Sequence, residues 1–114
     1  DVALNADPMT GYSFRFEGKW VVYGGTSVGA PEWAALWILV DEAAGKRIGN
    51  PNKLIYEMGR SADYGKLFYD ITRGDNGNNW GPGFKAGNNW DHPTGWGVPE
   101  GEALTDWVVK SQKP

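Results

Sequence analysis

The chain has 114 residues, enough for one domain with a modest core. Its apolar fraction of 40% is typical of a folded protein, and its net charge of −3 argues against a basic surface for nucleic acid. The absence of cysteine excludes disulfides and thiolate metal sites, and no apolar run approaches the ~20 residues that span a bilayer. We therefore expect neither a nucleic-acid partner nor a membrane partner.

The first elements expected along the chain are a loop and a β-hairpin. Residues 1–11 form the loop, because Asp7–Pro8 and Thr10–Gly11 are turn signals. Residues 12–16 and 19–23 are rich in aromatic and β-branched side chains and are separated by two residues. This spacing predicts antiparallel strands joined by a two-residue turn.

A helix over residues 27–46 is expected next. Pro31 falls near its first turn, where the missing N–H of proline does least harm. Residues 33–40 are apolar on every face, which predicts a helix that is buried all round. Such a helix needs more covering than a chain of this size supplies. Gly45 or Gly49 ends it.

Shorter elements occupy the rest of the chain. Residues 51–58 predict a helix, residues 59–66 a loop, and residues 67–71 a short extended segment. Residues 72–99 are rich in Gly, Asn and Pro, and a loop of this length inside a domain is usually functional or disordered. Three tryptophans anchor it in our interpretation: Trp80, Trp90 and Trp96. Residues 102–112 predict a closing amphipathic helix.

The junction between the hairpin and the first helix carries a candidate nucleophile. Gly24 and Gly25 allow a tight backbone turn, and Ser27 follows at the start of the helix. A serine there lies near unpaired N–H groups and the positive end of the helix dipole, where an oxyanion can be stabilised. The same pattern fits Thr26 or Ser27 as a simple N-cap, which is a commoner role.

The long loop is a candidate cation site. Calcium takes six to eight oxygen ligands, including carboxylates and main-chain carbonyls. Asp70 and Asp91 bracket the glycine-rich loop, which lacks the alternating acids and terminal Glu of an EF-hand. By composition alone a solvated loop fits equally well. We interpret Asp75 as a solvated turn residue.

Several stretches, in the same order along the chain, resemble one family. Residues 25–31 (GTSVGAP) are similar to the nucleophile signature of subtilisin-like serine peptidases, and the following EWAA is similar to the sedolisins, the serine-carboxyl peptidases. Residues 1–12 (DVALNADPMTGY) resemble the family's segment before the nucleophile strand. Its calcium loop is similar to DITRGDNG at 70–77, GNNWD at 87–91 and TGWG at 94–97.

The resemblance implies an α/β fold, with part of a subtilisin-like parallel sheet flanked by helices. It divides the chain into a nucleophile strand and helix at 12–47, a calcium loop at 70–99 and a terminal helix at 101–112. Ser27 would be the nucleophile. One calcium ion would be bound by two carboxylates and three main-chain carbonyls, those of Asp70, Asp91, Ile71, Gly87 and Asn89. The family usually has glycine at position 89, and asparagine tolerates the left-handed backbone well.

The base that a serine nucleophile needs is not evident in the chain. We interpret His92 as a loop residue and Glu32 as structural. Glu102 and Asp106 have the spacing of one helical face, which is usually a solvated face. Sedolisins use a Glu and an Asp, with a further Asp at the oxyanion hole, and all three lie upstream of the nucleophile in the family.

We therefore predict the C-terminal segment of an acid-acting serine-carboxyl endopeptidase, inactive alone. Its partners would be a peptide or protein substrate and the N-terminal part of the same peptidase. The family implies secretion. One alternative is a calcium-stabilised module that binds carbohydrate or protein without catalysis, because tryptophan suits sugar stacking. Another is a domain in which Ser27 is only an N-cap.

Overall fold

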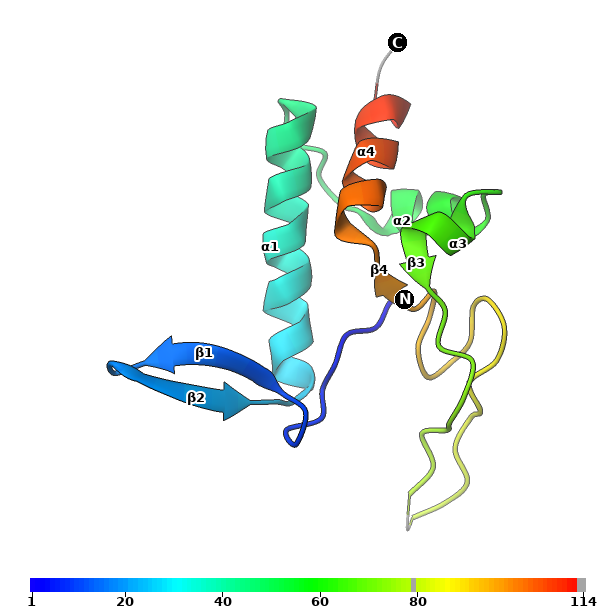
Figure 1. The fold of residues 1–114 in the computed structure, drawn as a ribbon. Coiled ribbons are helices and arrows are strands. Elements are labelled where there is room, and N and C mark those ends of the chain that lie inside the picture. Colours follow the sequence, from blue (N-terminus) through cyan, green and yellow to red (C-terminus); the bar gives the residue numbers. More distant parts are fainter. Residues whose placement is uncertain (79, 113–114) are drawn as a thin grey trace.

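The computed structural model describes residues 1–78 and 80–112. Two elements form a projecting hairpin and the others a helical body (Figure 1). The order along the chain is β1 (Tyr12–Phe16), β2 (Lys19–Tyr23), α1 (Thr26–Ala44), α2 (Asn52–Gly59), α3 (Tyr64–Leu67), β3 (Phe68–Tyr69), β4 (Val98–Pro99) and α4 (Gly101–Ser111). None of the helices in the described part is long and apolar enough to cross a membrane.

The hairpin forms as its spacing predicts. Tyr12 pairs with Tyr23 and Phe16 with Lys19, so that two residues, Glu17 and Gly18, make the turn. Both have positive φ, 48° and 76°, as the favoured turn of a two-residue hairpin requires. The strands twist away from the helical body into solvent (Figure 1).

Both described sheets are antiparallel pairs, β1 with β2 and β3 with β4. The expected stretch of parallel sheet is not among the described residues. The reason is connectivity, because β1 and β2 are joined by a tight turn, whereas parallel neighbours need a long crossover. The fold is still α/β in content, with helices and small sheets.

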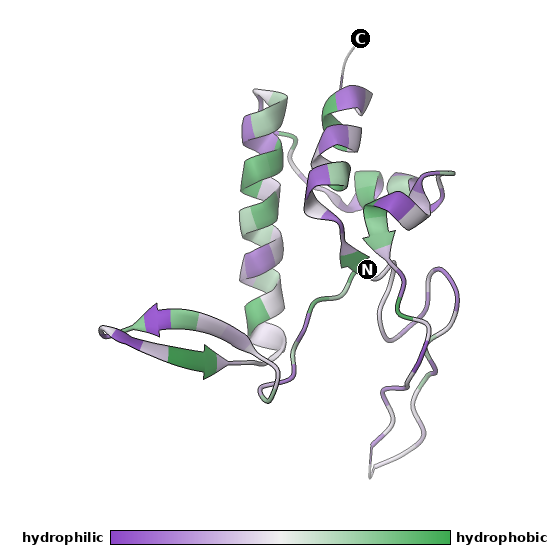
Figure 2. Ribbon diagram, in the orientation of Figure 1, coloured by the Kyte–Doolittle hydropathy of each residue, from purple (hydrophilic) through white to green (hydrophobic). Residues whose placement is uncertain are grey.

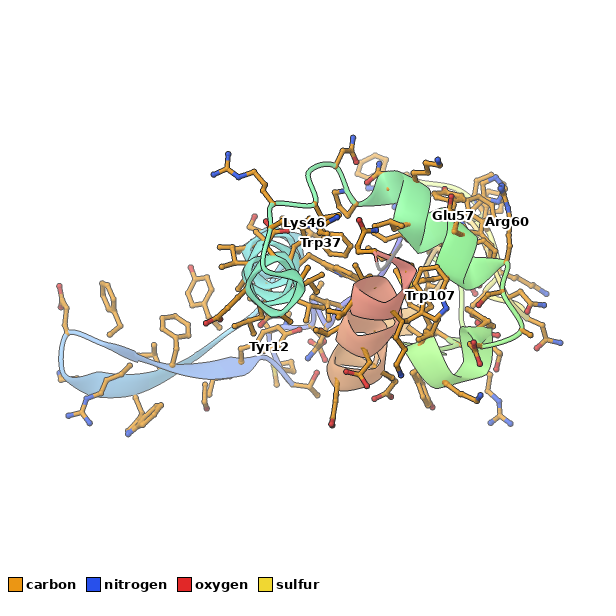
Figure 3. All side chains as sticks on the ribbon, turned by 90° about the horizontal axis from the view of Figure 1, so that it is seen from above. Tyr12, Trp37, Lys46, Glu57, Arg60 and Trp107 are labelled. Carbon is orange, nitrogen blue, oxygen red and sulfur yellow. The ribbon has the colours of Figure 1, made fainter. Side chains whose placement is uncertain are left out.

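Helix α1 is covered on one side only. Trp37 and Val40 are buried against the other helices, and α4 packs alongside α1. In Figure 3, Trp37 points from α1 toward the helical body. Ile38 and Leu39, on the other side, are 67% and 58% exposed. The expectation of a helix buried all round is therefore not met within this chain, and the expected shortage of covering is confirmed.

The core lies between the C-terminal half of α1 and helices α2 to α4. Its buried apolar residues are Trp37, Val40, Ile55, Met58, Leu67, Phe68, Trp96, Leu104 and Val108. Figure 2 shows hydrophobic residues along α1 and where α2 and β3 meet, and also on the projecting β2. The apolar surface of the chain is thus divided between a packed body and an exposed hairpin.

Two elements differ from the sequence-based expectation. The single turn α3 lies in the stretch expected to be a loop, and it forms because the Asp63 carbonyl accepts hydrogen bonds from the N–H groups of Lys66 and Leu67. Strand β4 lies inside the long expected loop and pairs with β3. This pairing closes the base of the loop over residues 70–97, so that the loop leaves and re-enters the body at one place (Figure 1).

Candidate active site and cation loop

Ser27 lies in the first turn of α1, with its side chain exposed. The N-cap is Gly25, whose φ of 135° suits glycine, and no side chain caps the helix. Neither Thr26 nor Ser27 is therefore the N-cap of α1. The alternative in which Ser27 serves only as an N-cap does not agree with the structure. The first turn holds no acidic residue, so no carboxylate neutralises the positive end of the helix.

The turn before Ser27 rests against the N-terminal segment. Gly24 lies so close to it that a Cβ at this position would be 2.4 Å from Pro8 Cα. Only glycine permits this approach without displacing backbone. The sequence predicts only a turn at Asp7–Pro8, since nothing in its pattern links residue 8 to residue 24.

A groove of about 600 Å³ runs beside the start of α1. Residues 2–6 form one wall, and the first turns of α1, with Thr26, Gly29, Ala30 and Trp33, form another; Pro93 closes it. The groove brings the N-terminal segment, the helix that carries Ser27 and the long loop to one place.

No base for Ser27 is evident among the described side chains. Glu32 lies against Tyr12 of β1, and partial burial, followed by this carboxylate, raises the pKa of the Tyr12 hydroxyl. His92 stacks on Phe84 with ring centroids 4.5 Å apart. No described hydrogen bond links either residue to Ser27.

The carboxylate pair on α4 is turned to solvent. The Asp106 carboxylate lies 3.6 Å from the Lys110 ammonium, and both side chains are about two-thirds or more exposed, 68% and 74%. Glu102 shares a shallow surface hollow with Asp106 and Lys66 of α3. This arrangement is that of a solvated helix face.

Asp91 is buried and well satisfied. One carboxylate oxygen accepts the Gly87 N–H at 2.9 Å, and the other accepts the Thr94 N–H at 2.8 Å and the Thr94 hydroxyl at 2.9 Å. Burial raises the pKa of Asp91, but these hydrogen bonds and the charge of His92 outweigh burial and hold it below its usual value. The carboxylate therefore stays ionised in mild acid.

Asp70 is only half satisfied. Its Oδ2 accepts the Asn89 N–H at 2.8 Å, while its Oδ1 is buried and has no partner among the described residues. A buried carboxylate oxygen without a partner is costly. Burial raises the pKa of the nearby Tyr64 hydroxyl, and the neighbouring Asp70 carboxylate and then the charge of Asp91 raise it further. The Tyr64 hydroxyl donates to the Trp96 carbonyl at 3.0 Å.

Asn89 has φ 63°, the left-handed conformation that glycine or asparagine adopts most readily. In the described part of the chain, no three acidic or histidine side chains gather as a metal site. The predicted calcium ligands would not form such a cluster, because only two of the five are carboxylates and the other three are main-chain carbonyls. Asp75 accepts the Gly77 N–H at 2.9 Å in an exposed turn.

Comparison with known proteins gives one consistent result. Kumamolisin of Bacillus sp. (strain MN-32) is 39% identical over 112 residues, 97% of this chain and 19% of the relative. Sedolisin of Pseudomonas sp. (strain 101) is 34% identical over 108 residues, 95% of this chain and 18% of the relative. Tripeptidyl-peptidase 1 of Homo sapiens is 31% identical over 113 residues, 91% of this chain and 19% of the relative. No family model matches the chain.

A solved structure supports the same relationship. It is Pseudomonas sedolisin, a serine-carboxyl proteinase complexed with two molecules of pseudo-iodotyrostatin. The TM-score is 0.84 at 31% identity, covering 98% of this chain and 29% of that one. The chain belongs to the sedolisin family of serine-carboxyl peptidases, and it spans only the short C-terminal part of its longer relatives.

Proposed function

We propose that this chain supplies the serine nucleophile of a serine-carboxyl endopeptidase that cleaves peptides or proteins at acidic pH. The observation that carries the proposal is the placement of Ser27. Its side chain is exposed at the start of α1, where Gly25 and not a side chain is the N-cap. A serine hydroxyl with no capping role, beside an unneutralised helix N-terminus, suits attack on a carbonyl.

In the proposed reaction, Ser27 Oγ attacks the carbonyl carbon of the scissile peptide bond, and its proton passes to a carboxylate base. The C–N bond then breaks, the amine leaves with that proton, and water hydrolyses the ester on Ser27. A carboxylate base is matched to acidic operation because its pKa lies near the working pH. The base and the oxyanion Asp come from the N-terminal part of the peptidase, so this chain alone is inactive.

We also propose one calcium ion in the loop, held by the carboxylates of Asp70 and Asp91 and the carbonyls of Ile71, Gly87 and Asn89. The unpaired buried Oδ1 of Asp70 supports this set, because a cation would satisfy it. The left-handed backbone at Asn89 and the lowered pKa of Asp91 support it as well. The ion would stabilise the loop and take no part in the chemistry.

The N-terminal part of the peptidase is the proposed cover for the open side of α1. Ile38 and Leu39 are 67% and 58% exposed there. An apolar helix face of this kind is usually buried in a complete fold. The same part would supply the subtilisin-like parallel sheet, and the family implies secretion.

One observation favours the alternative of a binding module. Trp80 is 95% exposed and Trp20 is 71% exposed, and flat aromatic faces can stack on sugars. Quenching of tryptophan fluorescence by oligosaccharides would support that function. Fluorescence that does not respond to sugars would count against it.

The peptidase proposal is tested by Ser27→Ala in the complete protein. We expect turnover of peptide substrates at acidic pH to fall by about 10³-fold or more, with the melting temperature nearly unchanged. Ser13→Ala, an exposed serine on β1, is the matched control and should retain turnover. Turnover retained in Ser27→Ala would sink the proposal.

A further inference from the structure

The N-terminal segment forms a compact turn over residues 5–10. The Asp7 carboxylate accepts the Met9 N–H at 2.9 Å through one oxygen and the Thr10 hydroxyl at 3.1 Å through the other. Asn5 reinforces the turn from the other side, because its carbonyl oxygen accepts the Asp7 N–H at 3.0 Å and its amide donates to the Thr10 carbonyl at 2.9 Å. These residues are exposed except Ala6, so hydrogen bonds rather than core packing fix the shape of the turn.

This turn is pressed against the backbone that leads to Ser27. A Cβ at Gly24 would lie 2.4 Å from Pro8 Cα and 2.7 Å from the Asp7 carbonyl carbon. A Cβ at Gly11 would lie 2.2 Å from the Tyr23 carbonyl oxygen. The turn itself and the residue that follows it therefore pack, backbone against backbone, on the end of β2 and on Gly24.

The position of Ser27 depends on this contact for a geometric reason. Gly25 has φ 135°, and α1 begins at the next residue. Because glycine adopts positive and negative φ about equally readily, Gly25 by itself does not fix the direction in which the chain enters the helix. Ile38 and Leu39 on the open side of α1 are exposed, so packing of that side against the described residues does not orient the helix. Residues 2–6 flank the first turns of α1, and the Asp7 turn is the neighbour that touches the backbone of Gly24 directly.

We propose that Asp7 is a positioning residue for the Ser27 nucleophile. Its carboxylate holds Pro8 against Gly24 and so fixes the direction in which the serine leaves the turn. This inference rests on the proposed function, because it assigns a role in catalysis to a residue that touches neither substrate nor Ser27.

The experiment compares Asp7→Ala with Asp7→Asn in the complete peptidase. A small displacement of a reacting group can cost up to about 100-fold in rate. We expect Asp7→Ala to lower kcat by about 10-fold to 100-fold with KM little changed, measured well below the melting temperature of each variant. Asp7→Asn should recover most of kcat, since its carbonyl oxygen can accept the Met9 N–H and its amide can donate to the Thr10 oxygen.

Asn50→Ala is the matched control. The Asn50 side chain accepts the Asn52 N–H at 3.0 Å in a similar exposed turn before α2, far along the chain from Ser27. Asn50→Ala should leave kcat unchanged. If Asp7→Ala lowers only the melting temperature and keeps the kcat of the parent enzyme, the positioning role is overturned.

A milder variant covers the case in which Asp7→Ala does not fold. Thr10→Val removes one of the two hydrogen bonds to the Asp7 carboxylate, together with the longer one from the Asn5 amide at 3.3 Å, and keeps the shape of the side chain. We expect an intermediate loss of kcat, and an unchanged kcat would overturn the inference. Ser27→Ala is measured in parallel, because turnover that survives it refutes the peptidase proposal itself, whatever Asp7 does.

Discussion

The body of helices and the part of the chain that carries Ser27 differ in how they are held. In the body, side chains from α1, α2, β3 and α4 bury one another, and Val40, Met58, Leu104 and Val108 are fully buried. Around Ser27, the strands of the hairpin expose large apolar side chains, with Trp20 at 71% and Tyr23 at 63%. Hydrogen-bonded turns and glycine contacts take the place of a core there.

The two parts also differ in compactness. The radius of gyration is 15.8 Å, whereas a compact domain of this length has about 13 Å. The excess comes from the hairpin and the long loop, which project from the body (Figure 1). The body buries its own apolar side chains, whereas the hairpin next to Ser27 leaves large apolar side chains exposed.

The largest expected effect on stability is in the body. Leu104→Ala removes a side chain that is 0% exposed at the contact between α4 and the rest of the core. We expect it to lower the free energy of unfolding of this chain by about 2–5 kcal/mol. Chemical denaturation followed by circular dichroism measures the change. A decrease in unfolding free energy of less than about 1 kcal/mol would mean that the core of the helical body is not tightly packed around Leu104.

Calcium should act on the loop rather than on the body. At a concentration 100-fold above its dissociation constant, a bound ion stabilises by about 2.7 kcal/mol, seen as a higher melting temperature. Asp70→Ala should abolish this response, and Asp75→Ala, in the exposed turn, should keep it. A response that persists in Asp70→Ala would exclude this residue as a ligand.

The two carboxylates should differ when no calcium is present. Asp70→Ala removes a buried oxygen that lacks a partner among the described residues, and one hydrogen bond, which comes from the N–H of the exposed Asn89 and which water can replace. It should therefore cost less than about 1 kcal/mol in a chelator. Asp91→Ala leaves Gly87 and Thr94 without their acceptor and should destabilise by about 1–3 kcal/mol. Equal losses in the two variants would contradict this division of roles.

The pH dependence of Asp91 gives a smaller effect. Its pKa is lower in the folded chain than in the unfolded one, where the usual value is 3.8. The unfolded state therefore binds its proton first as pH falls, and stability from Asp91 is full above about pH 5 and lost progressively below pH 4. The difference in melting temperature between the parent chain and Asp91→Asn, measured in chelator, should shrink from pH 6 to pH 2.5. A constant difference would contradict the lowered pKa.

The smallest expected effect on the stability of this chain is at the open face of α1. Ile38→Asp should change the unfolding free energy of this chain by no more than about 0.5 kcal/mol, since the side chain is 67% exposed. In the complete peptidase the same substitution should sharply reduce the yield of folded, active enzyme, because a charge would be buried without a partner. Glu42→Asp, a conservative change on the same helix, is the control. Normal enzyme from Ile38→Asp would mean that nothing covers this face.

The sequence by itself determined the features that depend on near neighbours in the chain. The two residues between β1 and β2 predict a tight hairpin turn, and the run of apolar residues at 33–40 predicts α1 and its shortage of cover. Asn89 is one of the residues that accept a left-handed backbone, and it has one. The motifs around Ser27 identify the sedolisin family, which the relatives confirm.

Only the tertiary structure decided the features that join distant residues. It makes Gly25 the N-cap of α1, pairs β4 with β3 across the loop, and places Pro8 on Gly24. Among the described residues, it also leaves one buried carboxylate oxygen of Asp70 without a hydrogen-bond partner, while both oxygens of Asp91 accept hydrogen bonds. Local preference cannot fix such contacts, because they form between segments that meet only when the chain is folded, and burial and close approach depend on that meeting.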